Sequence, residues 1–260
     1  MSEKEERLTE TIRVHIEKVT EEPYADILCY PRASDLELKS RIAELREHGV
    51  NEVEFFGATT VANVPVLGKG FVGVVIAAYL NGQKVALKIR RVDADRASLH
   101  REAELLAKAN AMQVGPRLIG VSKNFLLMQY IEGKALFEWL AAHREKMLVS
   151  EVLTDILEQC WRLDSIGLDH GELSNAPKHL LVDTKAKPWI VDFETASLSR
   201  RPANVTSVCQ FLFTSRSAVA RAVAEVLGER KREAIIDTLR HYKNERTREN
   251  FSRVMQVCLA

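Results

Sequence analysis

The chain lacks the features of membrane-spanning, secreted or strongly charged proteins. Its longest apolar runs, such as FVGVVIAAYL at 71–80, are too short and too interrupted to span a bilayer. The formal net charge is only +1, so no global electrostatic field points to nucleic acid or to a membrane surface. The opening stretch MSEKEERLTE is charged and has no apolar core behind it, which predicts a cytoplasmic protein without a secretory signal.

Cysteine and histidine are sparse, and neither is arranged as a metal-binding motif. The 4 cysteines are scattered without a C-x-x-C pair, which predicts reduced and mostly buried thiols. The 7 histidines lack the spacing of a metalloprotease helix or a zinc finger, so the sequence disfavours a dedicated zinc site. At 260 residues and 46% hydrophobic composition, the chain can bury one large core or two modest lobes.

Residues 1–50 have helical periodicity and are expected to form a helical N-terminal extension. A first helix is predicted over 3–20, and a second begins after Ser34, a favourable N-cap residue, and ends near Gly49. The apolar residues that would share one face of the first helix are Leu8, Ile12, Ile16 and Val19. The extension could serve as a docking module.

A change of pattern at Asn51 indicates a sheet. Short β-branched or apolar runs now alternate with Gly, Asn and Pro, and Asn81–Gly82 is a strong hairpin signal. A helix is expected over 94–112, with two further short strands after it. This part of the chain, 51–132, therefore predicts an antiparallel meander with one helix.

The last part, 133–260, is mostly helical. Two short strands, HLLVD and KPWIVDF, are joined by a turn, and apolar residues recur at helical spacing from about Asn204 to the end. The order of elements predicts an α+β fold of two lobes, 51–132 and 133–260, with the extension 1–50 in front.

A glycine-rich motif lies at the start of the predicted sheet. The stretch LGKGFVGVV places Gly68, Gly70, Gly73 and Val75 in the pattern G-x-G-x-x-G-x-V. A dinucleotide-binding fingerprint requires a helix directly after the glycines, whereas here a β-type run follows. A strand–turn–strand of this kind can close over phosphates through its backbone N–H groups. An ordinary hairpin turn is the alternative for this motif taken alone.

A lysine at the end of the next strand favours the phosphate interpretation. The stretch VALK ends at Lys88, whose ammonium could reach the phosphates, and a carboxylate from the following helix would have to hold it. The stretch REAELL offers Glu102 and Glu104, and the setting of Glu102 fits better. Further on, NFLLMQYIEG is expected to be a buried strand that leads into a hinge.

Two later motifs complete an ordered set. DHGELSNAPKHLLVD occupies 169–183, and VDFE follows at 191–194. Together with the earlier motifs, this set resembles the protein-kinase superfamily, and within it the small atypical kinases, the RIO kinases and the KEOPS-complex kinase, from about residue 66 to 200. The HGELS form resembles the RIO-type loop, and no activation segment ending in A-P-E follows.

The resemblance implies a bilobal kinase fold, ATP as the nucleotide and Mg²⁺ as the metal. Met128 would line the back of the pocket, and main-chain groups of Gln129 and Ile131 would bind the adenine edge. Asp192 would bind the metal that bridges the β- and γ-phosphates. The implied nucleotide-binding residues are Gly68, Gly70, Gly73, Val75, Ala86, Lys88, Glu102, Met128, Gln129 and Ile131, and the implied catalytic residues are Lys88, Glu172 and Asp192.

The catalytic loop departs from the family pattern at two positions. Glu172 stands where an Asp would accept the proton of the substrate hydroxyl, and misplacement of a catalytic group by about 1 Å can cost about 10²-fold in rate. The metal-binding Asn is missing, and His179 or Asn175 could replace it. Imidazole suits Mn²⁺ better than Mg²⁺, so Mn²⁺ is an alternative metal. Lys178 could add charge near the γ-phosphate, and His170 is expected to brace the loop.

Three functions remain open on the sequence. The leading one is an atypical serine/threonine kinase or weak ATPase that phosphorylates itself or an unidentified protein partner. The second is a pseudokinase scaffold that binds nucleotide without catalysis. The third is association with RNA or a ribonucleoprotein through RHYKNERTREN at 240–250, but interleaved glutamates favour a salt-bridged helix face.

Overall fold

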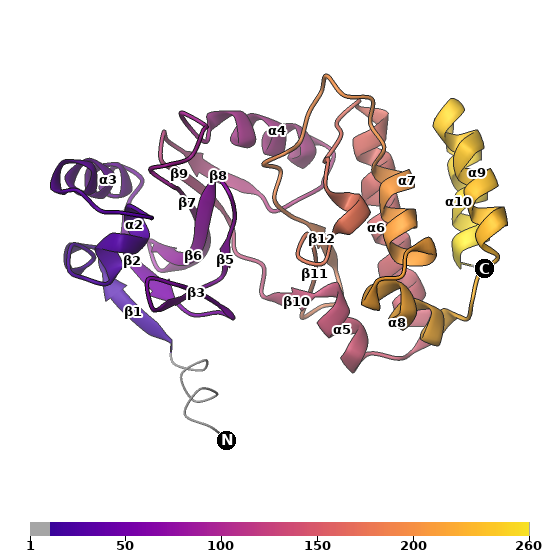
Figure 1. The fold of residues 1–260 in the computed structure, drawn as a ribbon, viewed down its shortest axis with the longest axis horizontal. Helices are drawn as coiled ribbons and strands as arrows, with labels where there is room; N and C mark the ends of the chain where they lie inside the picture. The colour runs from indigo at the N-terminus through magenta and orange to yellow at the C-terminus, as the bar shows by residue number, and fades with distance from the viewer. Residues whose placement is uncertain (1–10, 260) are drawn as a thin grey trace. The chain divides into compact units, whose positions relative to one another are not determined.

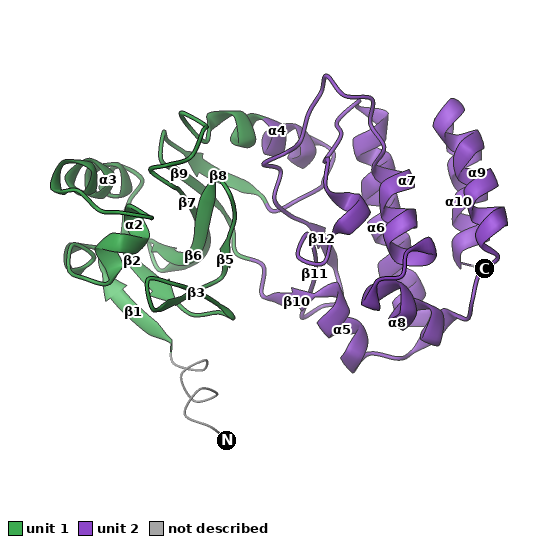
Figure 2. Ribbon diagram, in the orientation of Figure 1, with its two compact units in different colours: residues 1–104, 117–130 green, residues 105–116, 131–260 purple. Residues whose placement is uncertain are grey.

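The computed structural model describes residues 11–259, which form two compact units (Figure 2). Among the described residues, unit 1 contains residues 11–104 and 117–130, and unit 2 contains residues 105–116 and 131–259. An antiparallel sheet dominates the first and helices dominate the second, which confirms the predicted α+β fold class (Figure 1). The division into an extension and two lobes at residues 50 and 132 stays a prediction.

Unit 1 is built on a 7-stranded sheet in the order β1-β2-β6-β7-β9-β8, with β5 paired to β6. Its strands are β1 (Ile12–His15), β2 (Val50–Phe55), β5 (Gly68–Lys69), β6 (Gly73–Leu80), β7 (Gln83–Arg90), β8 (Leu118–Val121) and β9 (Phe125–Gln129). A separate hairpin joins β3 (Thr59–Val61) to β4 (Val64–Val66). The predicted turn between β6 and β7 is present, and both Asn81 and Gly82 have positive φ angles, of 50° and 80°, as a two-residue hairpin turn requires.

Different apolar clusters cover the two faces of this sheet. On one face, α2 (Tyr24–Leu28) and α3 (Asp35–Glu47) pack against alternate residues of the strands, such as Ile76, Leu87 and Leu127. On the other face, Leu126 packs with Ala103 of α4 (His100–Ala111). Successive residues of a strand point to opposite faces, so Leu126 and Leu127 belong to different cores.

The helix predicted over 3–20 is wrong within the described residues. Ile12–His15 form β1, which pairs antiparallel with β2, and only Ile16–Lys18 form a short 3₁₀-helix. Leu8 lies outside the described residues. The apolar residues are spaced for a helix, but the same set also contains the alternation of Val14 and Ile16, which are both buried. Pairing with β2 decides between the two patterns.

The second predicted helix is confirmed and is anchored to the sheet. Ser34 caps α3 by accepting a hydrogen bond from the backbone N–H of Glu37, and Gly49 follows the helix with a φ of 74°. Arg41 of α3 is fully buried and donates to the carbonyl oxygens of Leu28 and Arg90 at 2.5 and 2.6 Å. These bonds satisfy a buried guanidinium and join the N-terminal residues to the sheet. The helix predicted over 94–112 is shorter, since α4 begins at His100.

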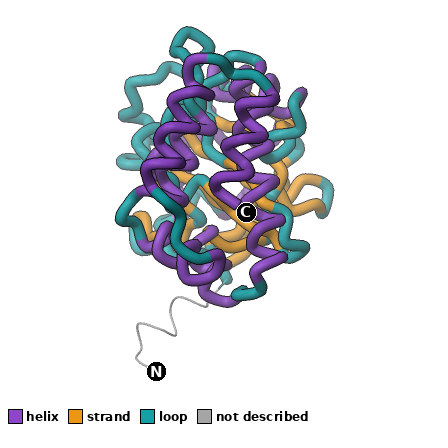
Figure 3. Tube along the Cα trace, turned by 90° about the vertical axis from the view of Figure 1, so that its right-hand side faces the viewer, coloured by secondary structure: helices purple, strands orange, loops and turns teal. Residues whose placement is uncertain are grey.

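Unit 2 combines a small sheet with a helical core. The sheet has the order β10-β11-β12, with strands Gly133–Ala135, Leu180–Asp183 and Pro188–Ile190. The helices are α5 (Leu136–Ala142), α6 (Lys146–Ser165), α7 (Asn204–Cys209), α8 (Ala218–Leu227), α9 (Arg232–Asn244) and α10 (Arg248–Leu259), with a π-helical turn η3 (Gln210–Thr214) after α7. The last two lie side by side (Figures 1 and 3). All four cysteines are free and buried, as predicted.

Candidate active site

A buried ion pair lies on the α4 face of the sheet in unit 1. The Nζ of Lys88 is 2.8 Å from Oε1 of Glu102, and the two side chains are only 5% and 3% exposed. Lys88 is paired across the strands with Val75 and Leu126, which places it on the face opposite α3. Glu104 is exposed and lies 3.4 Å from Arg101. The predicted choice of Glu102 over Glu104 as the partner of Lys88 is therefore confirmed as a contact.

The glycine-rich loop of unit 1 turns tightly above this pair. The N–H of Gly70 donates to the carbonyl oxygen of Gly73 at 2.8 Å. A Cβ added at Gly73 would lie 2.9 Å from the carbonyl oxygen of Ile89 and 3.1 Å from Cγ of Lys88, so a side chain would displace the lysine or the strand. Glycine at this position thus lets Lys88 pass beneath the loop.

The strand that precedes the expected hinge lies beside β7. Ala86 is paired with Met128, and Val85 with Gln129, so the residues expected around the adenine lie on adjacent strands. The N–H of Gln129 donates to the carbonyl oxygen of Arg117 at 2.8 Å. The main-chain group that Gln129 could offer to a nucleotide is therefore its carbonyl oxygen. Ile131 follows Tyr130, where unit 1 ends.

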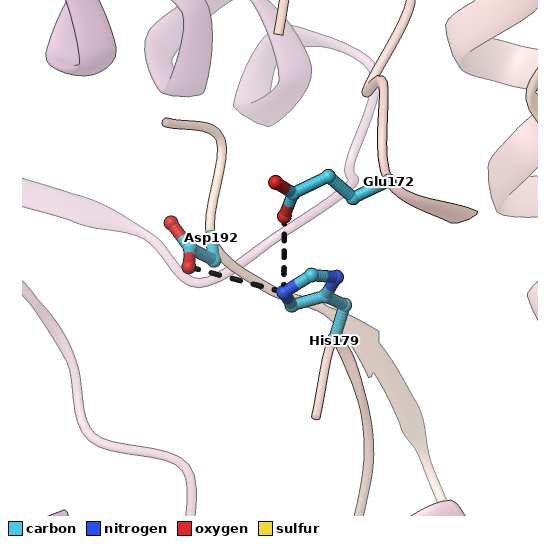
Figure 4. Close-up of side chains that lie close together, drawn as sticks. All are labelled: Glu172, His179 and Asp192. Carbon is cyan, nitrogen blue, oxygen red and sulfur yellow. Dashed lines mark ion pairs between the residues drawn. The ribbon is translucent and has the colours of Figure 1, made fainter. Parts of the chain in front are cut away.

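In unit 2, three predicted site residues come together. The Nε2 of His179 is 3.2 Å from Oε2 of Glu172 and 4.0 Å from Oδ2 of Asp192 (Figure 4). One ligand atom from each residue lies within 4.8 Å of the others. The side chain of His179 is 17% exposed, and those of the two carboxylates are 39% and 37% exposed. The group is open to solvent, unlike the Lys88–Glu102 pair.

The small sheet of unit 2 explains why these residues meet. Leu180 at the start of β11 is paired with Ile190 at the end of β12. His179 and Asp192 flank that pair, and the N–H of Val191 donates to the carbonyl oxygen of His179 at 3.0 Å. Asp192 has a positive φ of 68°, an uncommon conformation for a residue other than glycine. The backbone therefore turns away from the strand at Asp192, the residue that carries the carboxylate.

His170 braces the loop from below, as expected. Its ring is buried, packs edge-on against Phe193 at 5.1 Å, and places Nε2 3.1 Å from the carbonyl oxygen of Val191. Burial lowers the pKa of His170 to about 4, with a smaller contribution from His179. At neutral pH the ring is uncharged, so Nε2 carries the proton and donates it to Val191.

A polar network behind the loop was not predicted from the sequence. The Oδ1 of Asn204 accepts the backbone N–H of His170 at 2.8 Å, and its Nδ2 donates to Asp164 at 2.8 Å. Tyr242 of α9 donates its hydroxyl to the same carboxylate at 2.9 Å. Burial raises the pKa of Asp164, opposed by hydrogen bonds from Asn204 and Tyr242. Single polar residues inside helical patterns gave no signal of this network.

The other loop candidates lie on the surface. Asn175 ends the 3₁₀-helix Leu173–Asn175, is exposed, and donates its backbone N–H to the carbonyl oxygen of Glu172 at 3.2 Å. Lys178 is also exposed. The cluster of one imidazole and two carboxylates fits a divalent cation, and its imidazole suits Mn²⁺ better than Mg²⁺. Which residue replaces the missing Asn stays a prediction.

Comparison with known proteins finds one family and a relative. The family model for the RIO domain matches residues 75–205, which is half of the chain. An uncharacterized protein of Methanocaldococcus jannaschii is similar, with 29% identity over 100 residues that cover 38% of this chain and 83% of that protein. The RIO match contains Lys88, Glu102 and the three clustered residues of unit 2. Among residues 11–259, no helix is long and apolar enough to cross a membrane.

Proposed function

Since the chain belongs to the RIO-domain family, part of the atypical protein-kinase superfamily, we propose that it is an ATP-dependent phosphotransferase. It transfers a phosphoryl group to serine or threonine hydroxyls, either its own or those of a protein partner, with slow ATP hydrolysis as a side reaction. The observation that carries the proposal is the cluster of Glu172, His179 and Asp192, because it brings one ligand atom from each residue within 4.8 Å of the others, close enough to share a divalent cation.

The residues proposed to bind nucleotide have separate roles in the two units. In unit 1, Lys88 would neutralise charge on the α- and β-phosphates while Glu102 holds its ammonium in place. The glycine-rich loop would offer backbone N–H groups, and the carbonyl oxygen of Gln129 would accept from the adenine amino group. In unit 2, Asp192 and His179 would hold the divalent cation, with Asn175 as the alternative to His179.

The proposed chemistry relies mostly on position and charge. A bound Mg²⁺ or Mn²⁺ would neutralise the β- and γ-phosphate oxygens. Glu172 would accept the proton of the attacking hydroxyl, and its carboxylate is exposed enough for a substrate to reach. Before the cation binds, His179 would orient Glu172, since its Nε2 is 3.2 Å from the carboxylate. General-base assistance is a modest part of phosphoryl transfer, so an imperfectly placed glutamate slows the reaction without abolishing it.

A pseudokinase scaffold is the second candidate. The observation that favours it is the same 3.2 Å contact, because a hydrogen bond from Nε2 of His179 would occupy the carboxylate that should accept the proton. Association with RNA is less well supported. Arg248 and Arg253 of α10 pair with Glu158 and Glu249, and Glu225 of α8 is paired with Arg144, so two basic groups of the last helix already have acidic partners.

The test is phosphate transfer by Glu172→Gln, which keeps the size of the side chain and removes its basic oxygen. Autophosphorylation with Mg²⁺ or Mn²⁺ should fall at least about tenfold while ATP affinity stays within about twofold, as expected for an interaction made only in the transition state. Glu151→Gln, at an exposed glutamate of α6, is the matched control and should behave as wild type. A wild-type protein that binds ATP and transfers no phosphate with either metal would be a scaffold.

A further inference from the structure

The lysine of the glycine-rich loop is bound to the N-terminal part of the chain. The Nζ of Lys69 donates to the hydroxyl of Tyr30 at 2.6 Å and lies 4.4 Å from the centroid of the same ring. Tyr30 belongs to the segment between α2 and α3, and it packs against the core on that face of the sheet. One aromatic side chain therefore makes both a hydrogen bond and a cation–π contact to the loop.

The register of the strands places Lys69 and Lys88 on opposite faces of the sheet, so the two lysines do not act on the same phosphates. Lys69 is paired with Val74, which belongs to the core on the α3 face. Lys88 is paired with Val75, which points to the opposite face. The two lysines thus leave the sheet in opposite directions, although a lysine between two glycines suggests a phosphate ligand. Lys69 is placed to tether the loop.

A second cation holds the other end of the loop to the same tyrosine. The guanidinium of Arg91 lies 5.1 Å from the Tyr30 ring, and its Nη1 donates to the carbonyl oxygen of Gly70 at 3.3 Å. The backbone N–H of Val92 donates to the carbonyl oxygen of Tyr30 at 2.9 Å. Asp93 fixes Arg91 with two hydrogen bonds, of 2.8 and 2.7 Å. Tyr30 is therefore the point where both sides of the loop are attached.

We propose that Tyr30 is a positioning residue for the nucleotide, which acts through Lys69 and Arg91 to restrain the glycine-rich loop of residues 68–73. The inference rests on the proposed function, because a restrained loop matters only if it covers bound phosphates. Three glycines give the loop a large conformational freedom, and a tether lowers the entropy lost when the loop closes on a ligand. The N-terminal segment thereby sets how fast nucleotide leaves.

The experiment compares Tyr30→Phe with wild type. The variant keeps the ring and its contacts with both cations but removes the hydroxyl that accepts from Lys69. Dissociation of a fluorescent ATP analogue, followed by stopped flow, should become about three- to tenfold faster, which is the size expected for one hydrogen bond. The KM for ATP should rise by a similar factor with kcat unchanged. Amide hydrogen exchange of residues 68–73 without nucleotide should also become faster.

Tyr79→Phe is the matched control. Tyr79 also bears a cation on its ring, with Arg13 3.7 Å from the centroid, and donates its hydroxyl to Glu54 at 3.1 Å, but it lies near the far end of β6. Its nucleotide dissociation and the exchange of residues 68–73 should match wild type. Equal effects of both variants would show a general loss of stability and overturn the proposal.

Lys69→Met distinguishes a tether from a phosphate ligand. If Lys69 acts through Tyr30, Lys69→Met has the larger effect because it also removes the cation–π contact, and adding Tyr30→Phe to it has little further effect. Effects of Lys69→Met and Tyr30→Phe on affinity that add in the double variant would overturn the proposal, since the lysine would then bind phosphate directly. If the wild-type protein binds no ATP and Tyr30→Phe still shows faster exchange of residues 68–73, the tether is supported and only the proposed function is refuted.

Discussion

The two groups of candidate site residues differ in how tightly the fold encloses them. The Lys88–Glu102 pair of unit 1 is almost fully buried between a strand and a helix, whereas the Glu172–His179–Asp192 cluster of unit 2 is partly open to solvent. A buried charge requires its partner, so the first group is fixed by folding as well as by function. An exposed cluster tolerates substitution, and it is there that the chain departs from the kinase pattern. Departures at the open site therefore leave the fold intact.

The largest effect is expected for Lys88→Met, which would leave a carboxylate buried without its cation. The free energy of unfolding should fall by about 3–5 kcal/mol, as for other broken buried pairs, and ATP binding should be lost. Urea unfolding and calorimetry measure the two effects. Lys84→Met is a matched control on the same strand and face, because its pair with Glu54 is partly exposed and should contribute about 1 kcal/mol or less.

A second variant of the pair separates charge from packing. Lys88→Met combined with Glu102→Leu removes both charges and should recover most of the stability, since apolar pairs can replace buried ion pairs. ATP affinity should stay low in this double variant. Recovery of nucleotide binding without Lys88 would contradict the proposed role of its ammonium.

In contrast to Lys88→Met, Asp192→Ala should weaken nucleotide binding with little effect on stability. Its side chain is 37% exposed, so unfolding should change by less than about 1 kcal/mol, while the affinity for metal-bound ATP falls at least about tenfold. Titration calorimetry with Mg²⁺ and Mn²⁺ checks the affinity. Unchanged affinity in a folded variant would remove Asp192 from the site.

A smaller, selective effect is expected for His179→Asn, which restores the amide of the family pattern. The ratio of phosphate transfer with Mn²⁺ to that with Mg²⁺ should fall by about tenfold, because an amide oxygen suits Mg²⁺ better than an imidazole does. Direct Mn²⁺ binding, followed by electron paramagnetic resonance, should weaken in parallel. Asn175→Ala is the control, and a change of metal preference there would assign the role to Asn175 instead.

The smallest effect is expected for Tyr242→Phe. The variant removes a hydrogen bond to the buried Asp164, which holds Asn204 behind the loop that begins at His170. We expect a loss of about 1 kcal/mol in unfolding free energy and a change in phosphate transfer of less than about twofold. A large loss of transfer with little loss of stability would show that the network positions the loop.

Local signals predicted the parts of the molecule that depend on neighbours in sequence. The cap of α3 at Ser34, the Asn81–Gly82 turn and the pairing of Lys88 with Glu102 all follow from short patterns. The strand β1 was missed because its partner β2 begins at Val50, far along the chain, and helical spacing fits the same apolar residues. Long-range pairing overrides local periodicity in such a segment.

The candidate site also contains residues that the sequence motifs predicted and residues that they missed. The motifs predicted which residues of unit 2 would gather, because His179 and Asp192 flank two strands that pair. The motifs did not predict the contacts among Asn204, Asp164 and Tyr242, which join three helices. Neither did they indicate that Tyr30 contacts the glycine-rich loop, since cation–π contacts between distant segments have no sequence spacing.

The sheet of unit 1 is covered on both faces, and this sets the shortest fragment of the chain that can fold independently. Residues before Val50 supply the layer above Ile76, Leu87 and Leu127, although the family match begins only at Val75. A fragment cut at the family boundary would expose that apolar face and lose β1 and β2, leaving β6 as an open edge. Such a fragment should aggregate. The autonomous folding unit is thus longer than the segment that defines the family.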